Sequence, residues 1–146
     1  MGRMAALALA AALAGCGNHP DLQLTNLPVE CIGAPNRVLK ALERAPNPVR
    51  LQGKPISQCF LKNQSGTDVQ LLGTTLVAAA QQLGDRAGGN EAMALRLGYL
   101  VGAARRGARR NGVTDELVRR LEAETGGLGG NRQAYQRGVQ AGLATG

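Results

Sequence analysis

Arginines are the residues whose spacing points most directly to a chemistry. The densest group comprises Arg105, Arg106, Arg109 and Arg110, and it is followed by Arg119 and Arg120. Guanidinium groups gathered at a helix end can hold phosphate or carboxylate groups through paired hydrogen bonds. Cations near the C-terminus of a helix also offset the helix dipole, with no ligand involved. The sequence therefore leaves two interpretations of this cluster open, an anion-binding site and an ordinary charged helix end.

The chain as a whole is basic, with 17 Lys and Arg, 10 Asp and Glu, and a formal net charge of +7. Such a charge suits anionic lipid headgroups, anionic wall polymers or nucleic acid. An arginine-rich composition without any binding role explains the charge equally well. Aromatic residues do not alternate with the arginines, so we expect no sequence-specific binding of nucleic acid.

Groups that could catalyse a reaction are scarce. After residue 16 the chain has only two serines, Ser57 and Ser65, and its single histidine is His19. This set offers no evident dyad for nucleophilic catalysis. The segment GGLGGN lacks the strand and the Lys-Ser/Thr pair of a phosphate-binding loop, and we interpret it as a linker. The adjacent carboxylates Asp115 and Glu116 are explained by helix capping. We therefore expect no enzyme activity, no cofactor and no metal.

The N-terminus has the pattern of an exported protein. Arg3 precedes an apolar run of eleven residues, Met4–Ala14, which is too short to cross a bilayer. A basic start, a short apolar stretch and small residues after it are typical of a secretory signal peptide. The sequence Leu-Ala-Gly-Cys that ends at Cys16 then resembles the lipobox of bacterial lipoproteins. This resemblance is confined to the signal region, and it implies cleavage before Cys16, attachment of diacylglycerol to its thiol and acylation of the new N-terminus.

The other two cysteines form a candidate disulfide. Once Cys16 carries lipid, Cys31 and Cys59 remain as an even pair in a compartment where disulfides persist. Two free thiols or a metal site are the alternatives, but a metal needs more ligands than two distant cysteines. We predict a Cys31–Cys59 bridge. Such a bridge would help a thin core, because the chain has few aromatic residues: Phe60, Tyr99 and Tyr135.

Apolar periodicity predicts an all-α fold, a small bundle of about four main helices plus a short helix. The predicted helical segments are Pro35–Ala45, Pro55–Lys62, Ser65–Gly84, Asn90–Arg110, Thr114–Thr125 and Arg132–Leu143. Thr67 and Gln70 have the spacing of a capping box, and Gly84 is a plausible helix stop. Residues 49–54 (VRLQGK) are expected to form a loop or a short extended piece, and no segment shows the alternation of a strand.

Two predicted helices carry glycines at a spacing of four, Gly98 with Gly102 and Gly138 with Gly142. Glycine inside a helix costs about 0.5–1 kcal/mol relative to alanine, so the repeated pattern predicts that two helix backbones touch. A membrane-type helix pair is the alternative. The nearby arginines and the short apolar stretch favour packing inside a helical domain.

These features divide the chain into a signal peptide (1–15), a lipidated tether (16–30) and a helical domain (31–146). We expect a lipoprotein of the bacterial cell envelope, exported and anchored to a membrane by its N-terminal lipid, with a non-enzymatic binding or structural role. Its partner would be another envelope protein. The alternative is a basic module that binds anionic lipid or wall polymer through Arg105–Arg110.

Overall fold

Helices account for nearly all of the regular structure. The computed structural model describes residues 27, 29–60, 64–111 and 115–146. The α-helices are α1 (Val29–Ile32), α2 (Pro35–Leu42), α3 (Gly66–Ala87), α4 (Glu91–Asn111), α5 (Asp115–Ala123) and α6 (Arg132–Thr145). The remaining elements are strands β1 (Arg50–Leu51) and β2 (Lys54–Pro55) and the 3₁₀ helices η1 (Ile56–Cys59), η2 (Glu124–Gly127) and η3 (Gly129–Asn131). The prediction of an all-α bundle is confirmed.

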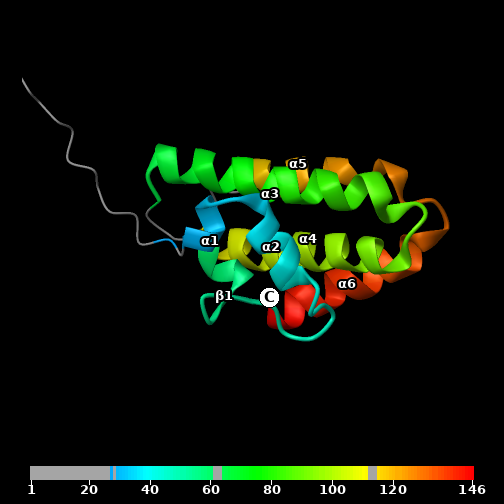
Figure 1. The fold of residues 1–146 in the computed structure, drawn as a ribbon. Helices are drawn as coiled ribbons and strands as arrows, with labels where there is room; N and C mark the ends of the chain where they lie inside the picture. Colours follow the sequence, from blue (N-terminus) through cyan, green and yellow to red (C-terminus); the bar gives the residue numbers. More distant parts are fainter. Residues whose placement is uncertain (1–26, 28, 61–63, 112–114) are drawn as a thin grey trace, which may run out of the picture.

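The long helices form two parallel pairs. In Figure 1, α3 and α5 lie in one layer and α4 and α6 in the other, with α2 in front of them. Gly98 of α4 lies against Tyr135 of α6, and Gly102, one turn later, lies against Val139. Because the contacts ascend along both chains, α4 and α6 point in the same direction. The contacts of α3 with α5 and η2 ascend in the same way, so these segments are also parallel.

Helix α3 differs from its predicted ends at both termini. Its N-cap is Ser65, whose hydroxyl accepts a hydrogen bond from the backbone N–H of Asp68 at 3.1 Å. The predicted capping box at Thr67 is wrong, because Thr67 lies inside the first turn. The predicted stop at Gly84 is also wrong, because the helix continues to Ala87. A Cβ at Gly84 would lie 2.5 Å from the carbonyl oxygen of Glu124, so this glycine serves a close contact with η2 instead of a helix end.

Helix α4 is the central helix of the bundle. Asn90 caps its first turn by accepting a hydrogen bond from the N–H of Met93 at 3.2 Å. Apolar residues around its circumference are buried, among them Leu97, Tyr99, Leu100, Val101 and Ala104. The sequence predicts this burial on more than one side, and the reason is that α4 contacts α3, α5, α6 and η1.

The segment after α5 is more ordered than a linker. Residues 124–131, which include GGLGGN, form η2 and η3, and Leu128 between them is buried. Asn131 donates from its Nδ2 to the carbonyl oxygens of Ala87 and Gly88, at 2.8 and 3.1 Å. The start of α6 is thereby fixed to the end of α3. The predicted cap at Thr114 lies outside the described residues.

The segment from α1 to η1 packs across the bundle. Two short strands pair antiparallel in it, Arg50 with Pro55 and Leu51 with Lys54, where the sequence predicts a loop or a short extended piece. Gln52 and Gly53 between them have φ angles of 47° and 78°. Positive φ at both central residues is the geometry of a type I′ hairpin turn. With two residues in each strand, the pair is too short to produce an alternating pattern.

Candidate functional site

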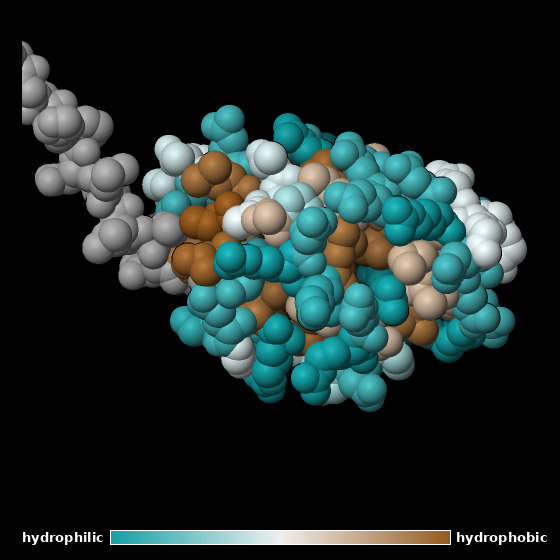
Figure 2. Space-filling model, in the orientation of Figure 1, coloured by the Kyte–Doolittle hydropathy of each residue, from teal (hydrophilic) through white to brown (hydrophobic). Residues whose placement is uncertain are grey.

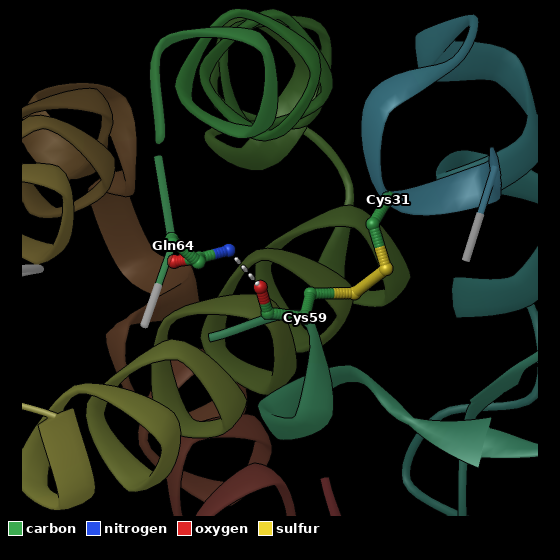
Figure 3. Close-up of a disulfide and its surroundings, with 3 residues drawn as sticks. All are labelled: Cys31, Cys59 and Gln64. Atoms are coloured by element: carbon green, nitrogen blue, oxygen red, sulfur yellow. Dashed lines mark hydrogen bonds between the residues drawn. A yellow bond between two sulfur atoms is a disulfide. The ribbon is translucent and has the colours of Figure 1, made fainter. Parts of the chain in front are cut away.

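The disulfide links the N-terminal end of the described chain to the bundle. Cys31 in α1 and Cys59 in η1 are bonded, with their Cα atoms 5.8 Å apart, and both residues are buried. Figure 3 shows the bridge running from α1 to η1, with Gln64 beside it. The Gln64 Nε2 donates to the carbonyl oxygen of Cys59 at 2.7 Å. The predicted Cys31–Cys59 bridge is confirmed.

The polypeptide enters the domain at α1, before the predicted boundary at residue 31. Leu27 is 4% exposed and belongs to the core, while Val29, two residues later, is 51% exposed. Thr75 of α3 donates from its Oγ1 to the carbonyl oxygen of Gly33 at 2.9 Å, which fixes the end of α1 to α3. Leu27 and residues 29–33 are therefore part of the domain. Cys16, the signal peptide and the tether up to residue 26 lie outside the described residues.

The arginine cluster of α4 is divided among several roles. Arg105 donates from its Nε to Glu122 Oε1 in α5 at 2.7 Å and pairs with the same oxygen through a terminal nitrogen. Arg106 donates to the carbonyl oxygens of Leu143 and Ala144 at the end of α6. Arg109 is exposed, and the side chain of Arg110 lies outside the described part. Two of the four arginines thus join helices to one another.

Tyr135 of α6 lies near the Arg105–Glu122 pair. Burial raises the pKa of the Tyr135 phenol above its ordinary value, while the Arg105 guanidinium lowers that pKa and the Glu122 carboxylate raises it. A phenol whose pKa is raised stays protonated and uncharged at neutral pH. It therefore adds bulk and a hydroxyl to this helix junction without adding charge.

The four glycines singled out in the sequence lie at the crossing of α4 and α6. A Cβ on Gly98 would lie 2.0 Å from the Tyr135 carbonyl oxygen, and one on Gly102 would lie 2.2 Å from that of Val139. On the other helix, a Cβ on Gly138 or Gly142 would lie 2.0 or 2.2 Å from a backbone oxygen of α4. The backbones of the two helices are therefore in direct contact, and every side chain larger than hydrogen is excluded at these positions.

An open groove runs between α3 and α5. Its volume is about 690 Å³, and its lining includes Gly73, Thr74 and Val77 of α3 and Glu116, Leu117 and Arg120 of α5. Glu116 already pairs with Arg119 and Arg120 on its own helix. Thr74 donates its hydroxyl to the carbonyl oxygen of Gln70 at 3.0 Å. Thr74, Glu116 and Arg120 are thus bound to neighbours on their own helices.

A second group of cations lies away from the predicted cluster. Five exposed residues form it: Arg37 and Lys40 of α2, Arg44 in the turn after α2, and Arg50 and Lys54 of the hairpin. We call these five residues the basic band. The basic band was not predicted, although residues 37, 40 and 44 have the i, i+3, i+7 spacing of one helix face in the sequence. Their spread over two elements made the group less conspicuous than adjacent arginine pairs.

Comparison with known proteins gave no relative: no protein-family model, no curated protein and no solved structure matches the chain. Within the described residues, no helix has both the length and the apolar character needed to span a membrane. Within the same residues, no three His, Cys, Asp or Glu side chains gather to hold a metal ion.

Proposed function

We propose that this chain is a lipoprotein of the bacterial cell envelope, anchored through lipid on Cys16, whose helical domain has a binding or structural role without catalysis. The observation that carries the proposal is the Cys31–Cys59 bridge at the point where the chain enters the domain. Disulfides persist in exported proteins and are rare in the reducing cytosol. The bridge therefore agrees with the export that the lipobox-like sequence implies.

The geometry of the domain entry suits an anchor that holds the domain close to a surface. Cys16 precedes the buried Leu27 by eleven positions, so the tether spans at most ~40 Å when fully extended. Both α1 and η1 are held by the disulfide, and α1 is also held by Thr75 of α3. The tether would thus be attached to a part of the domain that is held in place by a covalent bond and a hydrogen bond.

Replacement of the lipid-bearing cysteine tests the anchor. We expect Cys16→Ser to lose incorporated palmitate and to leave the membrane fraction or remain unprocessed. Cys31→Ser serves as the matched control, because it removes a cysteine of the domain and should keep the lipid label. If Cys16→Ser is processed and fractionates like the wild type, the anchor proposal is wrong.

Isolation of the protein from solubilised membranes separates the binding role from its alternative. A protein that co-purifies in stoichiometric amount supports a protein partner. Co-purifying acidic lipid or polymer supports the anion-binding alternative. For that alternative, Arg109 offers an exposed side chain, whereas Arg105 and Arg106 already have partners within the domain.

A further inference from the structure

The basic band begins on one face of α2 and continues through the turn after α2 to the hairpin. At 100° per residue, Arg37 and Lys40 lie about 60° apart around α2. Arg44 lies in the turn after α2, where its backbone N–H donates to the carbonyl oxygen of Ala41. The opposite face of α2 is anchored in the core through Val38 and Leu42, both fully buried. Helix α2 therefore cannot turn its cations away from solvent. Strand β1, which carries Arg50, contacts α2, and Lys54 is paired with Leu51 across the hairpin.

Most of these cations are not neutralised by the domain. Lys40, Arg44 and Lys54 form no ion pair with any residue that the structure describes. Arg37 is 3.9 Å from Glu30, and Arg50 donates to the carbonyl oxygen of Gly53. Residues 29–60 contain these five cations and two acids, Glu30 and Glu43, which leaves an excess of 5 − 2 = 3 positive charges.

The band adjoins the point where the chain enters the domain. Helix α1 directly precedes α2 and is covalently joined to η1, the element that follows the hairpin. Figure 2 shows hydrophobic side chains gathered at the end of the molecule formed by α1 and the start of α3, and hydrophilic side chains over the face formed by α2. At that end Val29 and Leu71 are 51% and 43% exposed.

We propose that the basic band docks on the anionic phospholipid headgroups of the membrane that carries the anchor, with Val29 and Leu71 beside the headgroup layer. The inference rests on the proposed lipid anchor, because a tether of at most ~40 Å keeps this face close to the bilayer. Cations next to an anionic leaflet are attracted within a Debye length of it, about 8 Å at physiological ionic strength. The lipid on Cys16 then limits the distance of the domain from the membrane, and the basic band sets the orientation of the domain on the membrane.

The test compares two charge-matched triple variants in the full chain carrying Cys16→Ser, so that no lipid contributes. The band variant is Lys40→Gln/Arg44→Gln/Lys54→Gln. The control variant is Arg86→Gln/Arg119→Gln/Arg132→Gln, which removes the same charge from exposed positions on α3, α5 and α6. Flotation is measured with phosphatidylcholine vesicles that contain or lack phosphatidylglycerol. All chains share the N-terminal apolar segment, so any binding by this segment is the same in every variant and does not affect the comparison.

We expect the band variant to lose roughly 100-fold in affinity for the phosphatidylglycerol vesicles at low salt, as three lost lysine or arginine contacts imply. The control variant should keep most of that affinity, and added salt should weaken the binding of both. Equal losses in the two variants, or no loss in either, would overturn the proposal. Retained binding of both together with a loss on Arg109→Gln would place the lipid site at the end of α4 instead.

A second measurement does not depend on the variants. Acetylation of lysines by a soluble reagent should label Lys40 and Lys54 less when phosphatidylglycerol vesicles are present. Full labelling of both lysines on saturated vesicles would contradict the docked orientation. Since these experiments use unlipidated chain, their outcome is independent of the Cys16 test. A lipid anchor without a docking face would change only the Cys16 test, and a docking face without an anchor would change only the vesicle binding.

Discussion

A single phenol links three parts of the domain. Tyr99 is fully buried in α4, and its Oη accepts a hydrogen bond from the N–H of Val49 at 2.9 Å. Thr145 donates its hydroxyl to the Ala141 carbonyl oxygen, so the 3.0 Å bond between Tyr99 and Thr145 has the tyrosine as donor. A chain of three hydrogen bonds thus runs from the loop before β1 through α4 into α6.

Removal of this hydroxyl should destabilise the domain. Tyr99→Phe leaves the buried N–H of Val49 without an acceptor, and we expect a loss of about 1–3 kcal/mol in the free energy of unfolding. Tyr135→Phe is the matched control, since no hydrogen bond to its hydroxyl occurs among the described residues, and it should change stability by less than about 0.5 kcal/mol. Urea denaturation of the three proteins gives both values. Equal losses for the two variants would show that the hydrogen-bond chain adds nothing.

At the scale of residues, local spacing predicts some contacts and misses others. The cap at Asn90 and the pairing of Cys31 with Cys59 follow from local pattern and from parity. The partner of Arg105 does not, because Glu122 belongs to another helix and only the packing of α4 against α5 brings it near. The N-cap of α3 is only partly predictable from local spacing. Ser65 and Thr67 are both good capping residues, and the pattern alone does not decide which of them precedes the first turn.

At the scale of elements, the fit of α6 against α4 depends on glycine. A methyl group on Gly102 would lie 2.2 Å from the Val139 carbonyl oxygen, whereas one on Gly73 of α3 would meet only Leu117 Cδ1 at 3.8 Å, in ordinary contact. Gly102→Ala should therefore force the helices apart and cost about 1–3 kcal/mol of stability. Gly73→Ala should increase stability by about 0.5–1 kcal/mol, because a helix-interior glycine is replaced without a clash.

Thermal or urea unfolding of the two glycine variants decides between packing and a membrane role. Opposite signs for Gly102→Ala and Gly73→Ala are expected if the glycines of α4 make the contact inside one domain. A gain in stability from both substitutions would mean that α4 and α6 do not approach closely in the isolated protein. That result would favour an association of these helices in lipid.

The helices themselves are largely predictable, and their ends are less so. Helices α3, α4 and α6 begin within one residue of the predicted position, because capping residues and apolar spacing act locally. Gly84 misleads because glycine serves both helix ends and close contacts, and only the neighbouring Glu124 distinguishes the two. Helix α1 escapes prediction since its four residues are too few for a period. Its place is set by Cys31 and by the burial of Leu27.

At the scale of the whole molecule, the disulfide limits the freedom of the segment that holds the basic band. It closes a loop with a sequence separation of 28 residues, from α1 to η1. In the chain-entropy model a loop of this size stabilises the native state by roughly 3–4 kcal/mol. That is a large share of the 5–15 kcal/mol typical of a domain.

Loss of the bridge should therefore lower stability strongly. We expect Cys31→Ala/Cys59→Ala to reduce the free energy of unfolding by roughly 3–4 kcal/mol, and reductant to produce a similar change in the wild type. Cys16→Ser should leave the unfolding curve of the domain unchanged. Peptide mapping without reductant should recover the linked pair from exported protein. Two alkylatable thiols in native protein, or an unaltered unfolding curve, would contradict this expectation.

The spacing of glycines along α6 creates an ambiguity of alignment. Gly138 and Gly142 of α6 and its C-cap Gly146 repeat every four residues, as do Gly98 and Gly102 on α4. A slide of α6 by four residues, about 6 Å at 1.5 Å per residue, would again place glycine against the α4 backbone. At the glycine positions, the crossing alone therefore admits both alignments. Asn131, bonded to the end of α3, and Thr145, bonded to Tyr99, hold opposite ends of α6. These two polar contacts form in only one of the two alignments, so they determine how α6 is positioned along α4.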